Sequence, residues 1–69
     1  MDAMIQAFRV ENLETRLGLH QFVCASLELE SEFAQTHEAR DILAQRRAEE
    51  MKDCDVLQFA VELLRREAE

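Results

Sequence analysis

The chain has 69 residues, one glycine, no proline and a formal net charge of −7. This length allows a single domain and excludes a nucleotide-binding βαβ domain or a barrel. The scarcity of glycine and proline also excludes a β-rich fold, because such folds need turn residues at short intervals. Apolar residues make up 48% of the chain, which is too many for intrinsic disorder. Composition therefore predicts an all-α protein in which residues 1–69 form one helical domain.

Residues 3–32 are predicted to form a long amphipathic helix. Read at about 100° per residue, large apolar side chains share one broad sector as far as residue 33. This broad stripe consists of Met1, Met4, Ile5, Phe8, Leu19, Phe22, Val23, Leu27, Leu29 and Phe33. A second, narrower stripe on another side consists of Val10, Leu13, Leu17 and Cys24. Asn12 and Thr15 interrupt the broad stripe.

Gly18 makes the middle of this helix ambiguous, because glycine costs about 1 kcal/mol in a helix interior. The chain either kinks within residues 10–18 or continues as a helix with two apolar sides. A third interpretation ends the helix at Leu17, with Gly18 as a left-handed cap and Leu19 folded back on Leu13.

A turn at about residues 32–36 and a second helix at about residues 37–67 follow. Thr36 is a good N-cap, and Glu38 in the first turn is favoured by the helix dipole. The apolar stripe of this helix is Ala39, Ile42, Leu43, Cys54, Leu57, Ala60, Val61 and Leu64. Asp55 and Gln58 have a capping-box spacing, so a break near residue 54 is the alternative. Two helices of similar length joined by one short turn predict an antiparallel hairpin.

Three charged residues, Arg46, Glu50 and Asp53, interrupt the second stripe at spacings that make them neighbours on a helix. Such a polar network either specifies the register between chains, as polar core residues do in coiled coils, or reaches water where the helices splay.

Surplus apolar rows predict association. A lone hairpin covers one stripe on each helix, so further rows would form an exposed patch. The expected surface comprises Val10, Leu13, Leu17, Val56, Phe59 and Leu63. We therefore expect a homodimer that forms a four-helix bundle or a longer helical assembly.

The sequence offers little for catalysis or metal binding. His20 and Cys24 are spaced to chelate a metal, and in a hairpin Cys54 could lie near them but His37 could not, so a four-ligand structural zinc site is not offered. We expect no catalytic, cofactor or metal residues. Cys24 and Cys54 are expected to be free thiols in a cytoplasmic protein, because neither a secretory signal nor a membrane segment is visible.

The expected function is a small, acidic, non-enzymatic interaction or regulatory module, of the kind found among phage and plasmid accessory proteins. It acts as a homodimer and binds a partner protein through a helical face. The alternative is a regulator of nucleic-acid processes, by direct RNA or DNA binding or by acidic mimicry. The charge of −7 disfavours direct binding, because phosphate neutralisation dominates nucleic-acid affinity.

Overall fold

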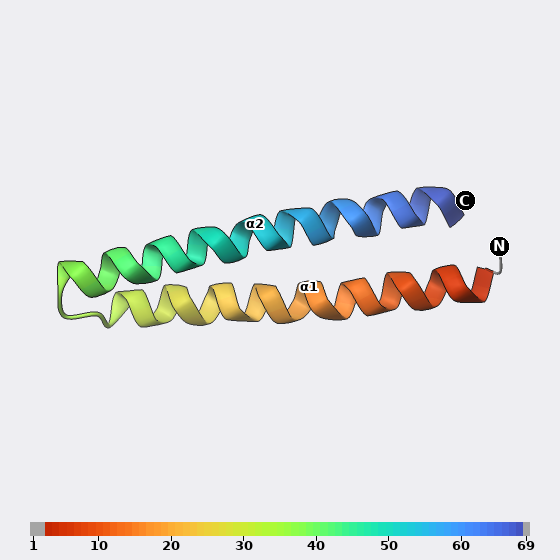
Figure 1. Ribbon diagram of the computed structural model, residues 1–69. Coiled ribbons are helices and arrows are strands. Elements are labelled where there is room, and N and C mark those ends of the chain that lie inside the picture. Colours follow the sequence, from red (N-terminus) through yellow and green to blue (C-terminus); the bar gives the residue numbers. More distant parts are fainter. Residues whose placement is uncertain (1–2, 69) are drawn as a thin grey trace.

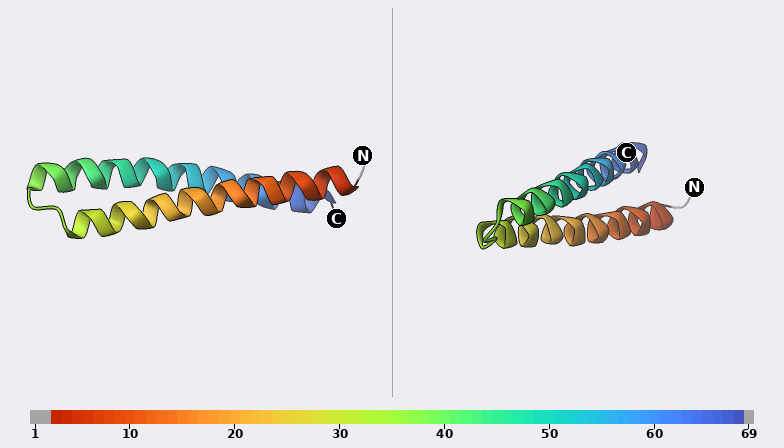
Figure 2. Two further views of the ribbon diagram at one scale, coloured as in Figure 1. Left: turned by 90° about the horizontal axis from the view of Figure 1, so that it is seen from below. Right: turned by 60° about the vertical axis from the view of Figure 1, so that its left-hand side comes forward.

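The computed structural model describes residues 3–68, which form an antiparallel two-helix hairpin (Figure 1). Helix α1 spans Ala3–Glu32 and helix α2 spans His37–Ala68. The hairpin is a thin rod with principal extents of 53 × 14 × 11 Å. The two helices cross at a shallow angle, and the start of α1 and the end of α2 lie at the end of the rod opposite the turn (Figure 2). The all-helical fold and the hairpin arrangement predicted from the sequence are thus confirmed.

The turn between the helices is built by the residues that the sequence suggests. The amide of Ala39 donates to Oγ1 of Thr36 at 3.1 Å, which satisfies one of the free amides at the start of α2. At the end of α1, the amides of Phe33 and Ala34 donate three residues back, to Glu30 and Ser31. These short-range bonds close the last turn without a glycine cap.

Both helices are continuous at the two places where the sequence also allowed a kink or a break, around Gly18 and near Asp55. Gly18 lies inside α1 and Asp55 inside α2, and no described residue has a positive φ. Helix-forming residues on both sides of Gly18 outweigh the small cost of one glycine. Each helix therefore presents a single uninterrupted face to the other.

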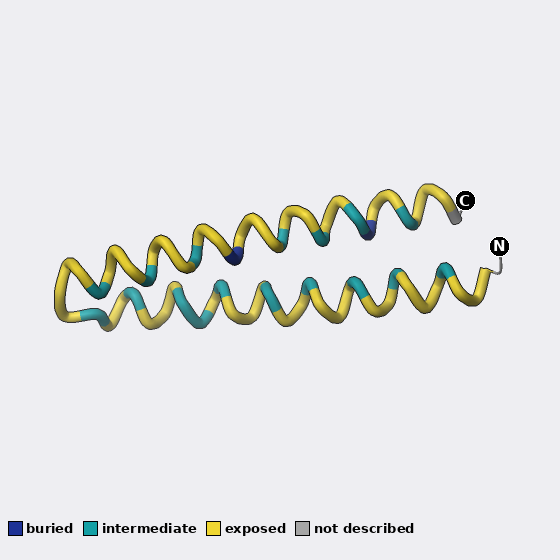
Figure 3. Tube along the Cα trace, in the orientation of Figure 1, coloured by how far each residue is buried: buried dark blue, intermediate teal, exposed yellow. Residues whose placement is uncertain are grey.

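The helices meet along an interhelical seam, in which every side chain is buried or half-buried (Figure 3). From α1 the seam takes Gln6, Val10, Leu13, Leu17, His20, Cys24, Leu27 and Ser31; from α2 it takes Ala39, Leu43, Arg47, Glu50, Cys54, Leu57, Val61 and Leu64. Val61, at 3% exposure, is the only buried hydrophobic residue in the described part of the chain. The hairpin by itself therefore has a seam rather than a closed core.

The face that α1 turns toward α2 differs from the expected one. The narrower stripe with Leu13 and Leu17 lies in the seam, whereas most of the broad stripe, including Phe8 and Phe22, is exposed. The seam of α1 alternates spacings of three and four residues, which is the repeat that keeps two supercoiled helices in contact. When the residues are projected at about 100° each, a row with this repeat drifts around the helix by about 20° per heptad. The row is therefore harder to recognise in the sequence as a single stripe. Met1, also assigned to the broad stripe, lies outside the described residues.

Neither described helix carries a stretch of residues that is apolar enough over sufficient length to cross a lipid bilayer.

Candidate association surface and the polar centre of the hairpin

The side of α1 that faces away from α2 carries a second row with the same alternation of three and four residues. We call it the outer row of α1; in the helix it consists of Ile5, Phe8, Asn12, Thr15, Leu19, Phe22, Ser26 and Leu29, of which Ser26 is half-buried, and Phe33 continues it just past the helix end. Phe22 is 71% exposed and Leu19 is 63% exposed, although both stand near the middle of the helix. At about 100° per residue, the outer row lies about 155° around α1 from the seam. It is therefore a separate face that α2 does not cover.

Helix α2 has a shorter exposed row of its own, Val56, Phe59 and Leu63. These three residues lie about 155° around α2 from its seam, so they face away from α1. The surface expected from the sequence joined this row to Val10, Leu13 and Leu17. The structure places those three residues in the seam instead, where they are half-buried. Within one hairpin, the six residues therefore do not form a common surface.

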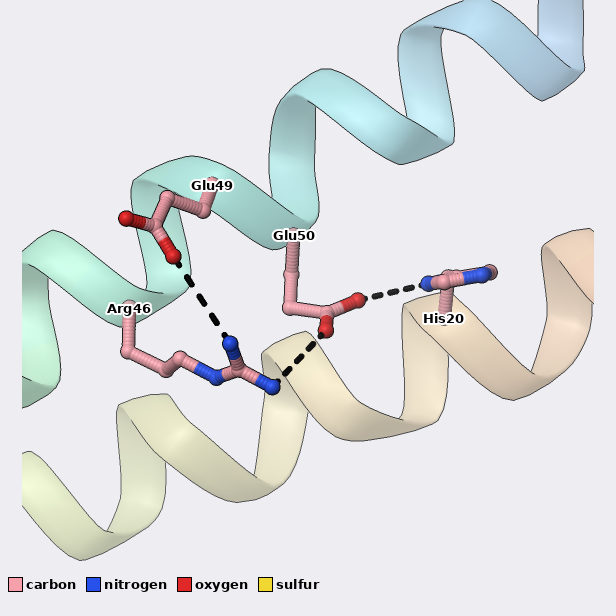
Figure 4. A network of polar contacts seen from close by, with 4 residues as sticks. All are labelled: His20, Arg46, Glu49 and Glu50. Carbon is pink, nitrogen blue, oxygen red and sulfur yellow. Dashed lines mark hydrogen bonds and ion pairs between the residues drawn. The ribbon is translucent and has the colours of Figure 1, made fainter.

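A polar cluster lies midway along the seam (Figure 4). Nδ1 of His20 lies 2.6 Å from Oε2 of Glu50 and donates the hydrogen, because a carboxylate only accepts. The other oxygen of Glu50 lies 3.7 Å from the Arg46 guanidinium, which also lies 3.7 Å from Glu49. Glu50 is only 8% exposed and is the one buried charged residue in the described part of the chain. The cluster thus gives this carboxylate a partner on each oxygen.

Of the predicted polar network, the structure brings together Arg46 and Glu50 by a direct contact. Asp53 is exposed, but one of its oxygens lies within 4.8 Å of the ligand atoms of His20 and Glu50. These groups offer a nitrogen and two carboxylate oxygens, a set that suits a first-row divalent metal. Both Glu50 oxygens already have protein partners. In this structure the Glu50 carboxylate is therefore already engaged by a hydrogen bond and an ion pair.

Two further ion pairs fix the register of the hairpin on either side of this centre. Arg47 lies 3.6 Å from Glu28 on the side of the turn, and Arg65 pairs with Glu14 toward the chain ends. Arg47 also places its Nε in the seam, where that atom has no hydrogen-bond partner among the described residues. Most of these charged groups are well exposed, so the pairs guide alignment more than they stabilise the fold.

The two cysteines are free and half-buried, and they lie beside each other across the seam. Burial raises the pKa of the Cys54 thiol above its ordinary value. A hydrogen bond with Cys24 and the nearby charges of Glu50 and Asp55 act in the same direction. Cys54 is therefore held in the neutral thiol form, which is a poor nucleophile.

Four polar residues of the seam, Gln6, His20, Ser31 and Arg47, lie outside the apolar stripes that the sequence predicts. A search for apolar residues passes over them. Their spacing is the signal that could have found them. His20 follows Leu17 by three residues and precedes Cys24 by four, which places it in the same row.

Comparison with protein-family models, with curated proteins and with solved structures finds no match to this chain. Its function must therefore be inferred from its own residues, among which the outer row of α1 carries large apolar side chains that α2 leaves exposed.

Proposed function

We propose that this chain is a non-enzymatic protein-interaction module that works as a homodimer and associates through the outer row of α1. The observation that carries the proposal is the exposure of this row. Phe8, Leu19, Phe22 and Leu29 of this row are each more than half exposed in the single hairpin. Exposed clusters of large apolar side chains are typical of association surfaces.

The exposed area of the hairpin supports the same proposal. A compact monomer of 8.1 kDa exposes about 4,500 Å². This chain exposes 5623 Å², an excess of about 1,100 Å² over that expectation. One partner in a standard interface buries about 800 Å². The excess is therefore large enough for one side of a stable homodimer interface.

The sparse core gives a second reason to expect a partner. Chains below about 70–80 residues rarely gain enough stability from one core, and they add disulfides, metals or a second chain. Here both cysteines are free, and Val61 is the only described hydrophobic residue that the hairpin buries. Each large side chain moved from water into an interface contributes about 1.5–3 kcal/mol. Covering the outer row of α1 supplies burial that the seam lacks.

Sedimentation equilibrium of two single variants tests the proposal. One variant changes a phenylalanine in the outer row of α1, and the other changes a phenylalanine in the exposed row of α2. Phe22→Glu puts a charge in the middle of the outer row of α1, and we expect it to convert the dimer to a monomer. Phe59→Glu is the matched control, because Phe59 is similarly exposed, at 62%, but lies on α2. We expect this variant to remain dimeric. The proposal is wrong if the unchanged chain is monomeric up to about 0.1 mM, or if only Phe59→Glu dissociates the dimer.

A further inference from the structure

We infer that two copies of this chain pair through α1 in a parallel orientation, with Asn12 of one copy facing Asn12 of the other. This inference rests on the proposed homodimer and specifies its geometry. The occupant of the outer row of α1 is then the same row of a second copy. The four helices lie in one layer, in the order α2, α1, α1 and α2, rather than in a square bundle.

The layer follows from the angle between the two rows of α1. In a square bundle, a helix contacts its two neighbours on faces about 90° apart. The seam and the outer row of α1 are about 155° apart. A second copy on the outer row therefore lies almost opposite α2, where it meets no part of its partner's α2. Because the outer row alternates spacings of three and four, the contact between the two α1 helices is a coiled coil.

The polar residues of the outer row favour the parallel orientation. In a parallel pair each residue of the row faces its own copy, so Asn12 meets Asn12 and the two side-chain amides can bond to each other. In the antiparallel register that best matches Leu19 with Phe22, Asn12 faces Leu29 and its amide is buried without a partner. Thr15 is compatible with burial, since its hydroxyl already donates to the carbonyl oxygen of Glu11 at 3.0 Å.

The charges beside the outer row favour the same orientation. Glu11 and Arg16 flank the row on opposite sides, and neither has an ion-pair partner within the described residues. In a parallel coiled coil they occupy positions that pair across the interface, so the dimer gains two Glu11–Arg16 pairs. In the antiparallel register Glu11 instead approaches Glu32 of the other copy, which is repulsive. The parallel dimer thus pairs charges that a single hairpin leaves unpaired.

Cross-linking at Thr15 distinguishes the two orientations. In a background with Cys24→Ala and Cys54→Ala, Thr15→Cys places two thiols face to face in the parallel dimer. In the antiparallel register the two thiols are about 16 Å apart, which is too far for a disulfide. We expect oxidised glutathione to convert most of the variant to a covalent dimer on non-reducing gels. Gln45→Cys, on the exposed side of α2, is the control and should remain monomeric on the gel.

A charge exchange tests the orientation in the unaltered background, without loss of the seam cysteines. Glu11→Lys and Arg16→Glu should each raise the dimer dissociation constant about tenfold, because each places like charges together. The double variant should return to within about threefold of the unchanged chain. Arg66→Glu, with the same change of net charge as Arg16→Glu but on α2, should have no effect.

The outcomes separate the orientation from dimerisation itself. A dimer that neither cross-links at residue 15 nor is restored by the double charge exchange overturns the parallel orientation and leaves the proposed function standing. Equal cross-linking at residues 15 and 45 overturns it as well, since the thiols then meet by random collision. A chain that sediments as a monomer overturns both proposals.

Discussion

His20 of α1 and Glu50 of α2 lie 2.6 Å apart, between Nδ1 and Oε2, in the middle of the seam. The two side chains are unequal in their access to water. That of His20 is 35% exposed and that of Glu50 only 11%. Removing His20 and removing Glu50 should therefore have different effects on stability. Without His20 a buried carboxylate loses its partner, whereas without Glu50 the remaining histidine still reaches water.

His20→Leu is expected to lower the free energy of unfolding by about 1–3 kcal/mol, because Glu50 loses its closest hydrogen-bond donor. Adding Glu50→Leu to this variant should restore or exceed the original stability, since two apolar side chains often replace a buried pair of polar groups without loss. Urea unfolding followed by circular dichroism measures both, at one fixed protein concentration. His37→Leu removes the other, exposed histidine and should change stability by less than about 0.5 kcal/mol. A double variant less stable than His20→Leu alone would contradict this account.

Gly18→Ala should raise the free energy of unfolding by about 0.5–1 kcal/mol, because glycine is a poor helix former. Gly18 is helical and exposed, and a Cβ at this position meets nothing within 4 Å. The reverse change at an exposed position of the same helix, Ala25→Gly, should lower stability by a similar amount. Thermal and urea unfolding of the two variants give the comparison. A destabilising Gly18→Ala would show that another chain approaches the helix closely at this position.

The turn and the helical class could be predicted from the sequence because local chemistry decides them. Thr36 is one of the residue types that accept a bond from a helix amide, and the structure shows that bond to Ala39. The continuity of α1 was left open because a single glycine is a weak signal in either direction. Its flanking residues decide the outcome, and the helix runs through Gly18 unbroken.

The choice of packing face could not be predicted in the same way. Periodicity analysis assigns the most apolar face to the core, and in α1 that is the face with Leu19 and Phe22. The seam instead uses a row that includes the polar residues Gln6 and His20. Cross-helix partners such as Glu50 make that row favourable, and they become visible only when both helices are placed together. An outer row more apolar than the seam is consistent with a second chain covering it.

Cys54 should be alkylated slowly in the folded protein, since its pKa is raised and the thiolate is the reactive form. Iodoacetamide labelling at pH 8, followed by mass spectrometry of each cysteine, measures the rate. The rate at Cys54 should rise when urea unfolds the chain. Equal rates in the folded and unfolded protein would show that the seam does not hold the thiol in its neutral form.

The same shift predicts how stability depends on pH. The pKa of Cys54 is higher in the folded state than in the unfolded state, so the unfolded thiol loses its proton first. The free energy of unfolding should therefore be unaffected by this group at neutral pH and should fall as pH rises above about 8.5. Cys54→Ala should remove this part of the loss. Urea unfolding at pH 7 and at higher pH tests it, and an unchanged slope in the variant would refute the assignment to Cys54.

Asn12→Leu should tighten the homodimer and make its orientation less specific. A polar residue at a core position of a coiled coil costs stability, and it favours the one alignment in which it can pair with its own copy. We therefore expect the dissociation constant to fall at least about tenfold, with leucine filling the outer row. In the Thr15→Cys background, the same change should lower the yield of covalent dimer, because antiparallel pairs then compete. Gln21→Leu adds a leucine to an exposed position of α1 outside the outer row and should alter neither quantity. An unchanged dissociation constant in Asn12→Leu would place Asn12 outside the interface, and a weaker dimer would mean that Asn12 contacts a different partner group.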